Sequence, residues 1–480
     1  MKTHPRGRVP VTAFVGLSFG VTGALVALCL CAGPAFAADA AAPDIKAGAA
    51  KASLVPPFPT PMGGFSARTE KFTGVESAPN ARALVLDNGT TKVAIITCEL
   101  IGVSRANVDK AREQIEKATG IPAKNIMISA THNHSAPSGS MAADNFPKAD
   151  VDKLNEFFVN TWVKVATDAA QAMAPANLFY GMGHLDYMTH NRQQNNDTVI
   201  DPDMGVLKVQ KKGSYDVIAV LFNFAAHPVI LSSDNLKLSS EYPGHASETV
   251  ETVLGGVALF TQGACGDQTI KRNGPPFDEV KRIGHVVGAE AIRAAESAIP
   301  SNDTTLISNF RDVTLEPRKI PTAADANAAV EKAQKALDEA KAANQSPEVL
   351  SRLSRALDGA KTTVKIVERA AQRPPEMVRR ATQGCVQVMQ IGPLVIVGMP
   401  AELFVEYALE LKARIRQETG RPVIFVGYAN NLNGYVITPR AFFTGGYEQS
   451  VTQLDPSAGR TFVETAMAMV NDCIKPVNRK

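Results

Sequence analysis

Residues 81–100, ARALVLDNGTTKVAIITCEL, contain two apolar runs, the second of them rich in β-branched residues. Runs of this kind are typical of strands buried in a protein core. The next segment, RANVDKAREQIEKATG (105–120), has apolar residues at helical spacing and ends at Gly120, where a left-handed helix cap is expected. The stretch therefore predicts strands followed directly by a helix.

The same alternation of strands and helices continues along the chain. Further apolar runs predict strands within 205–210, 216–231, 257–267, 386–403 and 422–438. Helical patterns lie at 151–173, 246–255, 283–299 and 403–420, and the last of these also ends at a glycine. Interleaved strands and helices predict a mixed α/β (α+β) fold in which sheets and helices form layers.

Residues 322–373 differ in composition from the rest of the chain. They contain no aromatic residue and are rich in Ala, Lys, Glu and Arg. We expect a helical hairpin that turns near 344–347, with Pro321 and Pro374 at its outer boundaries. Such a hairpin can be a lid, an oligomer contact or a solvated insert, and we favour the solvated insert.

The N-terminus has the pattern of a secretory signal peptide. A basic start precedes an uncharged apolar run at 11–31, and the small-residue site Ala-Phe-Ala follows at 35–37. We expect cleavage after residue 37, leaving one domain, residues 38–480, secreted or in the periplasm. The alternative is a segment retained as a membrane anchor.

Charge and cysteine content exclude several classes of protein. Residues 1–37 carry three cations and no anions, so their removal lowers the formal net charge from +3 to 0. Nucleic-acid binding needs clustered Lys and Arg, so we do not expect a nucleic-acid partner. The cysteines outside residues 1–37 are widely scattered, so their spacing indicates no particular disulfide pair and matches no zinc–thiolate site. They are Cys98, Cys265, Cys385 and Cys473.

Unusual polar residues stand where the apolar runs stop. Strand ends and the loops beyond them are where α/β proteins usually place their sites. Histidine nitrogens and carboxylate oxygens are ordinary zinc ligands, although each residue taken alone is more often structural, as when a His-Pro pair ends a strand. The residues are His132, His134, His227, Asp267, Glu402 and Tyr435.

Several segments resemble the neutral (non-lysosomal) ceramidase family, in the family's order, from about Pro61 to Glu448. THNHSAPSG (131–139) is similar to the family's THTHSGPGG, and GYANNLNGYVITPRAFFTGGYE (427–448) to GLTNxYxxYxTTxEEYxxQRYEG. The other matching segments are NFAAHPVILSSDN, SSEYPG, DPDMGVLKV, HNRQQ and VGMPAELFVEYALELK.

The resemblance implies a zinc-dependent amide hydrolase that splits ceramide, or a related lipid-like N-acyl substrate, into a fatty acid and an amine. It places the zinc ligands at His132, His227, Glu402 and Tyr435. It implies no obligate protein partner, and transient contact with a membrane surface is left open.

The resemblance also assigns residues that act on the substrate. His134 is a candidate to move protons or to hydrogen-bond the oxyanion that develops during amide cleavage, and Tyr447 could donate to the same oxyanion. Arg192 could orient a substrate hydroxyl or carbonyl. Gly64, in PMGGFSAR, corresponds to a family glycine near the site.

The chain departs from the family pattern in two places. The family's GDxSPN segment reads GDQTIKRNG here, so Thr269 stands at the serine whose hydroxyl attacks or positions the substrate. We expect water activated at the metal to attack, with Thr269 positioning the substrate. The family's C-terminal β-sandwich domain has no counterpart after Tyr447, which leaves open a different amide or ester substrate, or a catalytically silent ligand-binding protein.

Overall fold

The computed structural model describes residues 45–65, 68–139, 147–193, 199–372, 375–444 and 446–477. All of these belong to one compact unit that spans 42–480. The predicted signal peptide, residues 1–37, lies outside the described residues. Within the described ranges, no helix is both long and apolar enough to cross a membrane.

The larger sheet has nine strands and mixes parallel and antiparallel pairs. β4–β5 and β9–β11, at its two edges, are parallel pairs, while the strands between them pair antiparallel. The order is β11 (Val257–Gln262), β9 (Val217–Phe224), β8 (Asp203–Lys211), β6 (Ala174–His184), β1 (Lys46–Ser53), β3 (Asn80–Asp87), β4 (Lys92–Cys98) and β5 (Ile126–Ala130), and β13 (Ile299–Ser301) pairs with β6.

A second sheet has four strands, in the order β14 (Leu306–Thr314), β15 (Gln383–Ile391), β16 (Leu394–Gly398) and β18 (Val423–Val426). Its β16–β18 pair is parallel. Three short strand pairs complete the described pairing: β2 (Gly74–Val75) with β10 (Lys237–Leu238), β7 (Thr189–Asn191) with β12 (Gln268–Ile270), and β17 (Glu402–Leu403) with β19 (Tyr435–Val436).

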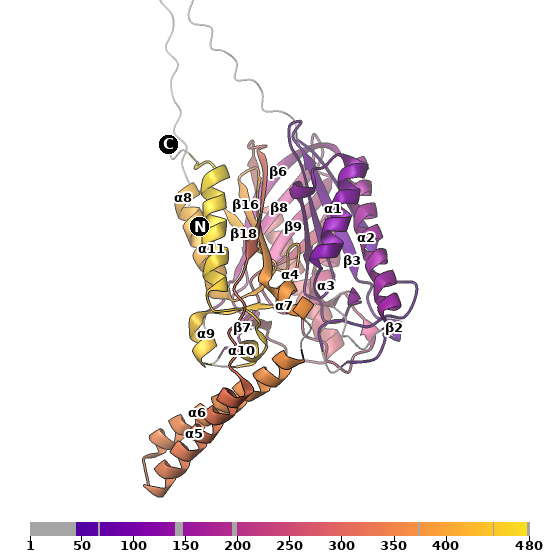
Figure 1. The fold of residues 1–480 in the computed structure, drawn as a ribbon. Coiled ribbons are helices and arrows are strands. Elements are labelled where there is room, and N and C mark those ends of the chain that lie inside the picture. The colour runs from indigo at the N-terminus through magenta and orange to yellow at the C-terminus, as the bar shows by residue number, and fades with distance from the viewer. Residues whose placement is uncertain are drawn as a thin grey trace, which may run out of the picture. The chain divides into compact units, whose positions relative to one another are not determined.

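Alternating side chains on the strands define four layers. In β3, Ala83 and Val85 pack with α1 (Arg105–Thr119) and α2 (Lys148–Gln171), whereas Leu84 faces the second sheet. β8, β9 and β11 pack in the same way against α3 (Glu241–Leu254) and α4 (Pro276–Glu296). The outer face of the second sheet is covered by α8 (Val405–Thr419) and α11 (Ala458–Cys473). The predicted layered α/β fold is confirmed (Figure 1).

Among the strands that the apolar patterns did not predict, β1, β6 and β14 are the longest. β1 reads KAGAAKAS and has no β-branched residue, because α2 lies directly against it. A Cβ at Gly48 would come within 2.1 Å of the Ala169 carbonyl oxygen, and one at Gly181 of β6 within 2.1 Å of the Ala294 carbonyl oxygen. Small residues permit this close helix–sheet contact, and they also give these strands only a weak hydrophobic pattern in the sequence.

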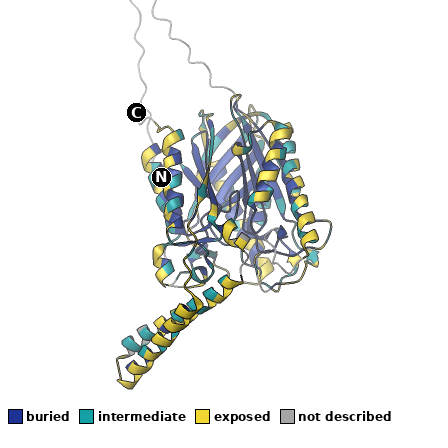
Figure 2. Cartoon of the chain, in the orientation of Figure 1, coloured by how far each residue is buried: buried dark blue, intermediate teal, exposed yellow. Residues whose placement is uncertain are grey.

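Residues 322–373 contain two helices at the expected positions, α5 (Ala323–Ala342) and α6 (Pro347–Ala371). They pack on each other and are largely exposed (Figure 2). Asn344, in the turn, has a positive φ of 49°, and the Thr322 side chain caps α5. α7 (Pro375–Thr382) leads back to β15, while Pro374, the expected outer boundary, lies outside the described residues.

Candidate metal centre and surrounding site

Four candidate residues lie beyond the carboxyl ends of strands. His132 lies two residues after β5, His227 three after β9, and Glu402 four after β16. Tyr435 follows β18 and pairs with Glu402 in the short parallel ladder β17–β19. β5 and β9 belong to the larger sheet and β16 and β18 to the second sheet, so the site lies where strand ends of the two sheets come together.

His132 is held in an unusual backbone conformation. Its φ is +66°, in the left-handed region that a non-glycine residue adopts at a cost on the order of 1–3 kcal/mol. The ring is buried, its Nδ1 lies 2.8 Å from the Ile101 carbonyl oxygen, and Tyr428 stacks on it with ring centroids 4.2 Å apart. The surrounding structure therefore fixes both the backbone and the ring of this histidine.

His227 is fixed in the same way. Its Nδ1 lies 2.7 Å from the Cys265 carbonyl oxygen, and its side chain is fully buried. A carbonyl oxygen can only accept a hydrogen bond, so the Nδ1 atoms of both histidines carry the proton and each Nε2 presents a lone pair. The two Nε2 atoms are 3.0 Å apart, and Glu402 Oε2 lies 3.4 Å from His132 Nε2 and 3.6 Å from His227 Nε2.

This donor set fits a metal ion. Two lone pairs and a carboxylate that face one another repel unless a cation or a proton lies between them. Burial, reinforced by the nearby Arg192 charge, holds the pKa of His227 well below its usual range, which disfavours the proton. Nδ1 bonds to backbone carbonyls are also the usual way in which metal-binding histidines are oriented.

His134 completes a buried cluster of three imidazoles. One ring nitrogen from each of His132, His134 and His227 lies within 4.8 Å of the others. Neither His134 ring nitrogen makes a hydrogen bond of ordinary geometry with any described residue. Burial and the neighbouring His132 keep the pKa of His134 well below its usual range, so its ring is neutral. Gly64, with φ +98°, lies against this ring.

Arg192 connects Tyr435 to the surrounding loops. Its Nη2 donates to the Tyr435 hydroxyl at 2.9 Å and to the Gly266 carbonyl at 2.8 Å, and its Nε lies 2.6 Å from Glu448 Oε1. Burial and the Glu402 charge raise the pKa of Tyr435, so in this arrangement its phenol keeps its proton.

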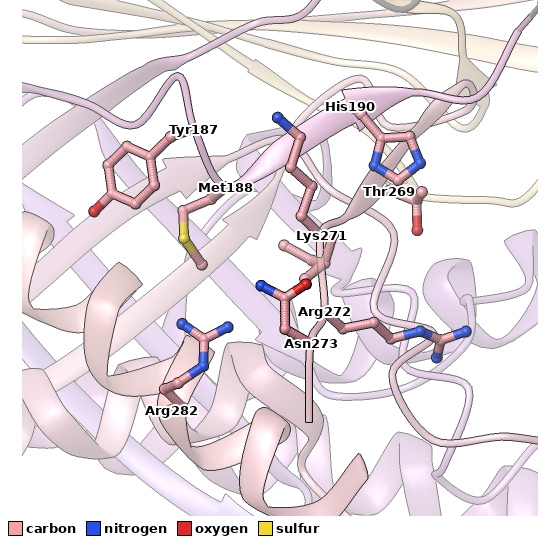
Figure 3. A pocket seen from close by; sticks show the side chains of 9 residues that line it. Tyr187, Met188, His190, Thr269, Lys271, Arg272, Asn273 and Arg282 are labelled. Carbon is pink, nitrogen blue, oxygen red and sulfur yellow. The ribbon is translucent and has the colours of Figure 1, made fainter. Parts of the chain in front are cut away.

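Tyr447 and Thr269 lie at the edge of the site. The Tyr447 ring is 6.0 Å from the Tyr435 ring, and the residue is 63% exposed. Thr269, in β12, pairs with His190 of β7 on one side and forms a bridge with His227 on the other. Its side chain lines an open pocket of about 560 Å³ (Figure 3).

The structure brings most of the sequence-predicted residues together. His132, His227 and Glu402 converge, and Tyr435 and Arg192 are hydrogen-bonded beside them. Asp267 lies behind the site, where its carboxylate accepts from Asn191 Nδ2 at 2.7 Å and Val405 N at 3.0 Å. Burial raises the pKa of Asp267 to about 7.

Sequence reasoning missed three residues that shape the site. Tyr428 stacks on His132, Glu448 holds Arg192, and Arg68 donates from Nη2 to the His134 carbonyl at 2.6 Å. Glu448 directly follows Tyr447 in the segment GGYE, which was a usable signal. The contacts of Tyr428 and Arg68 depend on loop conformation and had no sequence signal.

Comparison with known proteins relates the chain to neutral ceramidases. Residues 48–277 match the model of the neutral/alkaline non-lysosomal ceramidase family, N-terminal. The chain is 26% identical over 469 residues to neutral ceramidase of Pseudomonas aeruginosa, which covers 85% of this chain and 69% of that protein. It is 23% identical over 460 residues to neutral ceramidase of Mycobacterium tuberculosis, covering 82% and 71%.

A solved structure shares the fold. The crystal structure of the Pseudomonas aeruginosa neutral ceramidase superposes with a TM-score of 0.70 and 22% identity, over 91% of this chain and 76% of that one. The match of residues 48–277 to the family model, the relatives found along most of the chain and the common fold agree. The chain is therefore similar to the neutral/alkaline non-lysosomal ceramidase family, whose N-terminal model matches residues 48–277.

Proposed function

We propose that the protein is an exported zinc-dependent hydrolase that cleaves the N-acyl bond of ceramide or a related N-acyl lipid, releasing a fatty acid and an amine. The observation that carries this proposal is the pair of Nε2 lone pairs, 3.0 Å apart, that face the Glu402 carboxylate. Export rests on the sequence of residues 1–37 alone.

The zinc would be held by His132 and His227 through Nε2, by Glu402 and by Tyr435. His134 offers a third imidazole in the same cluster. When bound, zinc supplies Lewis acidity to an amide carbonyl and lowers the pKa of nearby water. For Tyr435 to serve as a ligand, its hydroxyl must share its oxygen between the ion and Arg192, a cation that favours the ionised phenol.

The protein's own residues can support hydrolysis by water. The neutral His134 ring can take a proton from the attacking water and give it to the leaving nitrogen as the acyl C–N bond breaks. Tyr447 can donate to the oxyanion, and Arg192 presents positive charge on the same side. Thr269 lines the adjoining pocket and is placed to position substrate.

The surface beside Tyr447 suits a lipid-like substrate. Phe443 is 85% exposed and Tyr447 63% exposed, on neighbouring helices α9 (Pro439–Thr444) and α10 (Tyr447–Val451). Exposed aromatic side chains of this kind are suited to contact acyl chains or a membrane surface for a short time.

The test is hydrolysis of ceramide by the purified protein, followed by mass spectrometry of the released fatty acid. We expect activity that is lost on chelation and restored by zinc. Fatty-acid release that is unaffected by complete removal of metal would overturn the zinc assignment. Stoichiometric zinc with no hydrolysis of any N-acyl substrate would support the ligand-binding alternative.

A further inference from the structure

The open pocket beside Thr269 is basic. It is lined by Lys271, Arg272 and Arg282, together with His190 and Asn273 (Figure 3). None of the described residues that line it is acidic. Lys271 and Arg272 follow Thr269 and Ile270 in the segment GDQTIKRNG.

The charges in the pocket are only partly neutralised. Arg282 is paired with Glu279, with Nε–Oε1 and Nη2–Oε2 distances of 2.6 and 2.8 Å. Arg272 instead donates from Nη1 to the carbonyls of Val229 and Ile230, which hold its position but do not neutralise its charge. Lys271 is exposed and makes no ion pair with a described residue. The Lys271 ammonium therefore remains available to a ligand, and the charge of Arg272 is not neutralised by a described carboxylate.

His190, which also lines the pocket, has a ring nitrogen without a hydrogen-bond partner among the described residues. This nitrogen is Nδ1, and it is buried. Desolvation and the nearby Lys271 charge lower the pKa of His190, so the ring is neutral and can donate one hydrogen bond. A group with several acceptor oxygens would satisfy this nitrogen and the Lys271 ammonium together.

The pocket adjoins the candidate metal centre. His190, Thr269 and His227 are successive partners across three neighbouring strand segments. Directly paired residues place their side chains on the same face, and neighbouring strands lie about 4.8 Å apart. A group bound between Lys271 and His190 would therefore lie next to Thr269, one strand away from the imidazole cluster.

We propose that this pocket binds an oxyanion, phosphate or carboxylate, carried by the amine portion of the substrate, so that the protein prefers acidic N-acyl lipids to neutral ones. The inference rests on the proposed function and specifies its substrate class. A charge-assisted hydrogen bond from Lys271, reinforced by the positive charge of Arg272, would improve kcat/KM for the acidic substrate about 10- to 100-fold.

The test compares matched substrates. Ceramide and ceramide 1-phosphate with the same acyl chain give one pair, and an N-acylethanolamine with the corresponding N-acylglycine gives a carboxylate pair. We expect higher kcat/KM for the anionic member of at least one pair, and which pair responds distinguishes phosphate from carboxylate. Lys271→Met should lower the anionic-to-neutral ratio about tenfold. Lys110→Met, at an exposed position on α1, makes the same charge change outside the pocket and should leave the ratio unchanged.

Failure of this inference can be told apart from failure of the proposed function. Hydrolysis of neutral substrates with no preference for either anionic compound would overturn the inference and keep the function. If no substrate is hydrolysed, the function fails, and titration of the full chain with inorganic phosphate decides the pocket. Binding weakened about tenfold by Lys271→Met but not by Lys110→Met supports the pocket, and equal binding by all three proteins overturns it.

Discussion

His132 Nε2 and His227 Nε2 face each other at 3.0 Å, and each ring is oriented by a backbone carbonyl from a different loop, that of Ile101 or Cys265. A side-chain substitution cannot remove either backbone carbonyl. The backbone conformation itself therefore fixes the orientation of the two Nε2 lone pairs. Removing an imidazole is therefore the direct way to test whether this arrangement holds a metal.

We expect His132→Ala and His227→Ala each to lose bound zinc, because each removes one inward-facing lone pair. Metal content measured by plasma emission spectroscopy and fatty-acid release should fall together. His285→Ala, at an exposed position on α4, is the matched control and should retain both. Full zinc occupancy in the two buried variants would show that the ligand assignment is wrong.

Gly64→Ala should disturb His134 specifically. At φ +98° an alanine costs about 1–2 kcal/mol of stability, and its Cβ would come within 2.3 Å of His134 Nδ1. We expect lower kcat in a protein that still folds. Gly89→Ala has a similar backbone cost at φ +86° but meets nothing within 4 Å, so it should lose stability and keep kcat. Equal kcat values in the two variants would contradict the role of Gly64.

Asp267 should make stability depend on pH. Burial raises its pKa from 3.8 to about 7, so the folded state holds a proton that the unfolded state has already released. Stability should therefore fall as the pH rises from about 4 to about 7, by on the order of 2–4 kcal/mol from this group.

Urea unfolding at pH 5 and pH 7 measures this effect. Asp267→Asn should be less stable at pH 5, because its amide cannot accept from both Asn191 and Val405 as the carboxyl does, and its loss of stability between the two pH values should be smaller. Glu241, whose pKa burial also raises to about 7, adds to the pH dependence in both proteins. An unchanged slope in the variant would exclude Asp267 as a contributor.

Replacing residues 322–373 with a short Gly-Ser joint should leave zinc content unchanged. The two helices pack on each other and contribute none of the proposed ligands. The end of α6 lies near α10, and the charge of Arg369 acts on Tyr447, so we expect a moderate rise in KM. Loss of zinc in a variant with an unchanged circular-dichroism spectrum would mean that the hairpin supports the metal centre directly.

The sequence predicted strands where apolar residues alternate or run together, as in β3, β4 and β9. It did not predict β1, because the small residues that allow α2 to pack closely on this strand carry little hydrophobic signal. The candidate site shows the same contrast between features that have a sequence pattern and features that depend on the folded backbone. Side chains at strand ends could be named from their motifs, whereas the carbonyls of Ile101 and Cys265 that orient them are common to all residues and are selected only by the folded path.

Thr269 has a different role in each of two routes of amide cleavage: attack by water and attack by the threonine hydroxyl. The structure places a histidine in the strand segment on each side of it, His190 and His227, so a base is closer than the sequence alone suggested. No described hydrogen bond joins either ring to the threonine hydroxyl, and His227 is oriented toward His132 and Glu402. We therefore expect water to attack, with Thr269 positioning the substrate.

Thr269→Val keeps the shape of the side chain and removes its hydroxyl, while Thr269→Ser keeps the hydroxyl and removes the methyl group. If water attacks, the valine variant loses one hydrogen bond, about 0.5–1.5 kcal/mol, which lowers kcat/KM by up to roughly tenfold, and the serine variant stays near the parent protein. If the hydroxyl attacks, valine should cost several orders of magnitude with zinc retained, and an acylated threonine should be detectable by mass spectrometry of the quenched reaction. The second pattern would establish Thr269 as the nucleophile and would reassign His190 or His134 as its base.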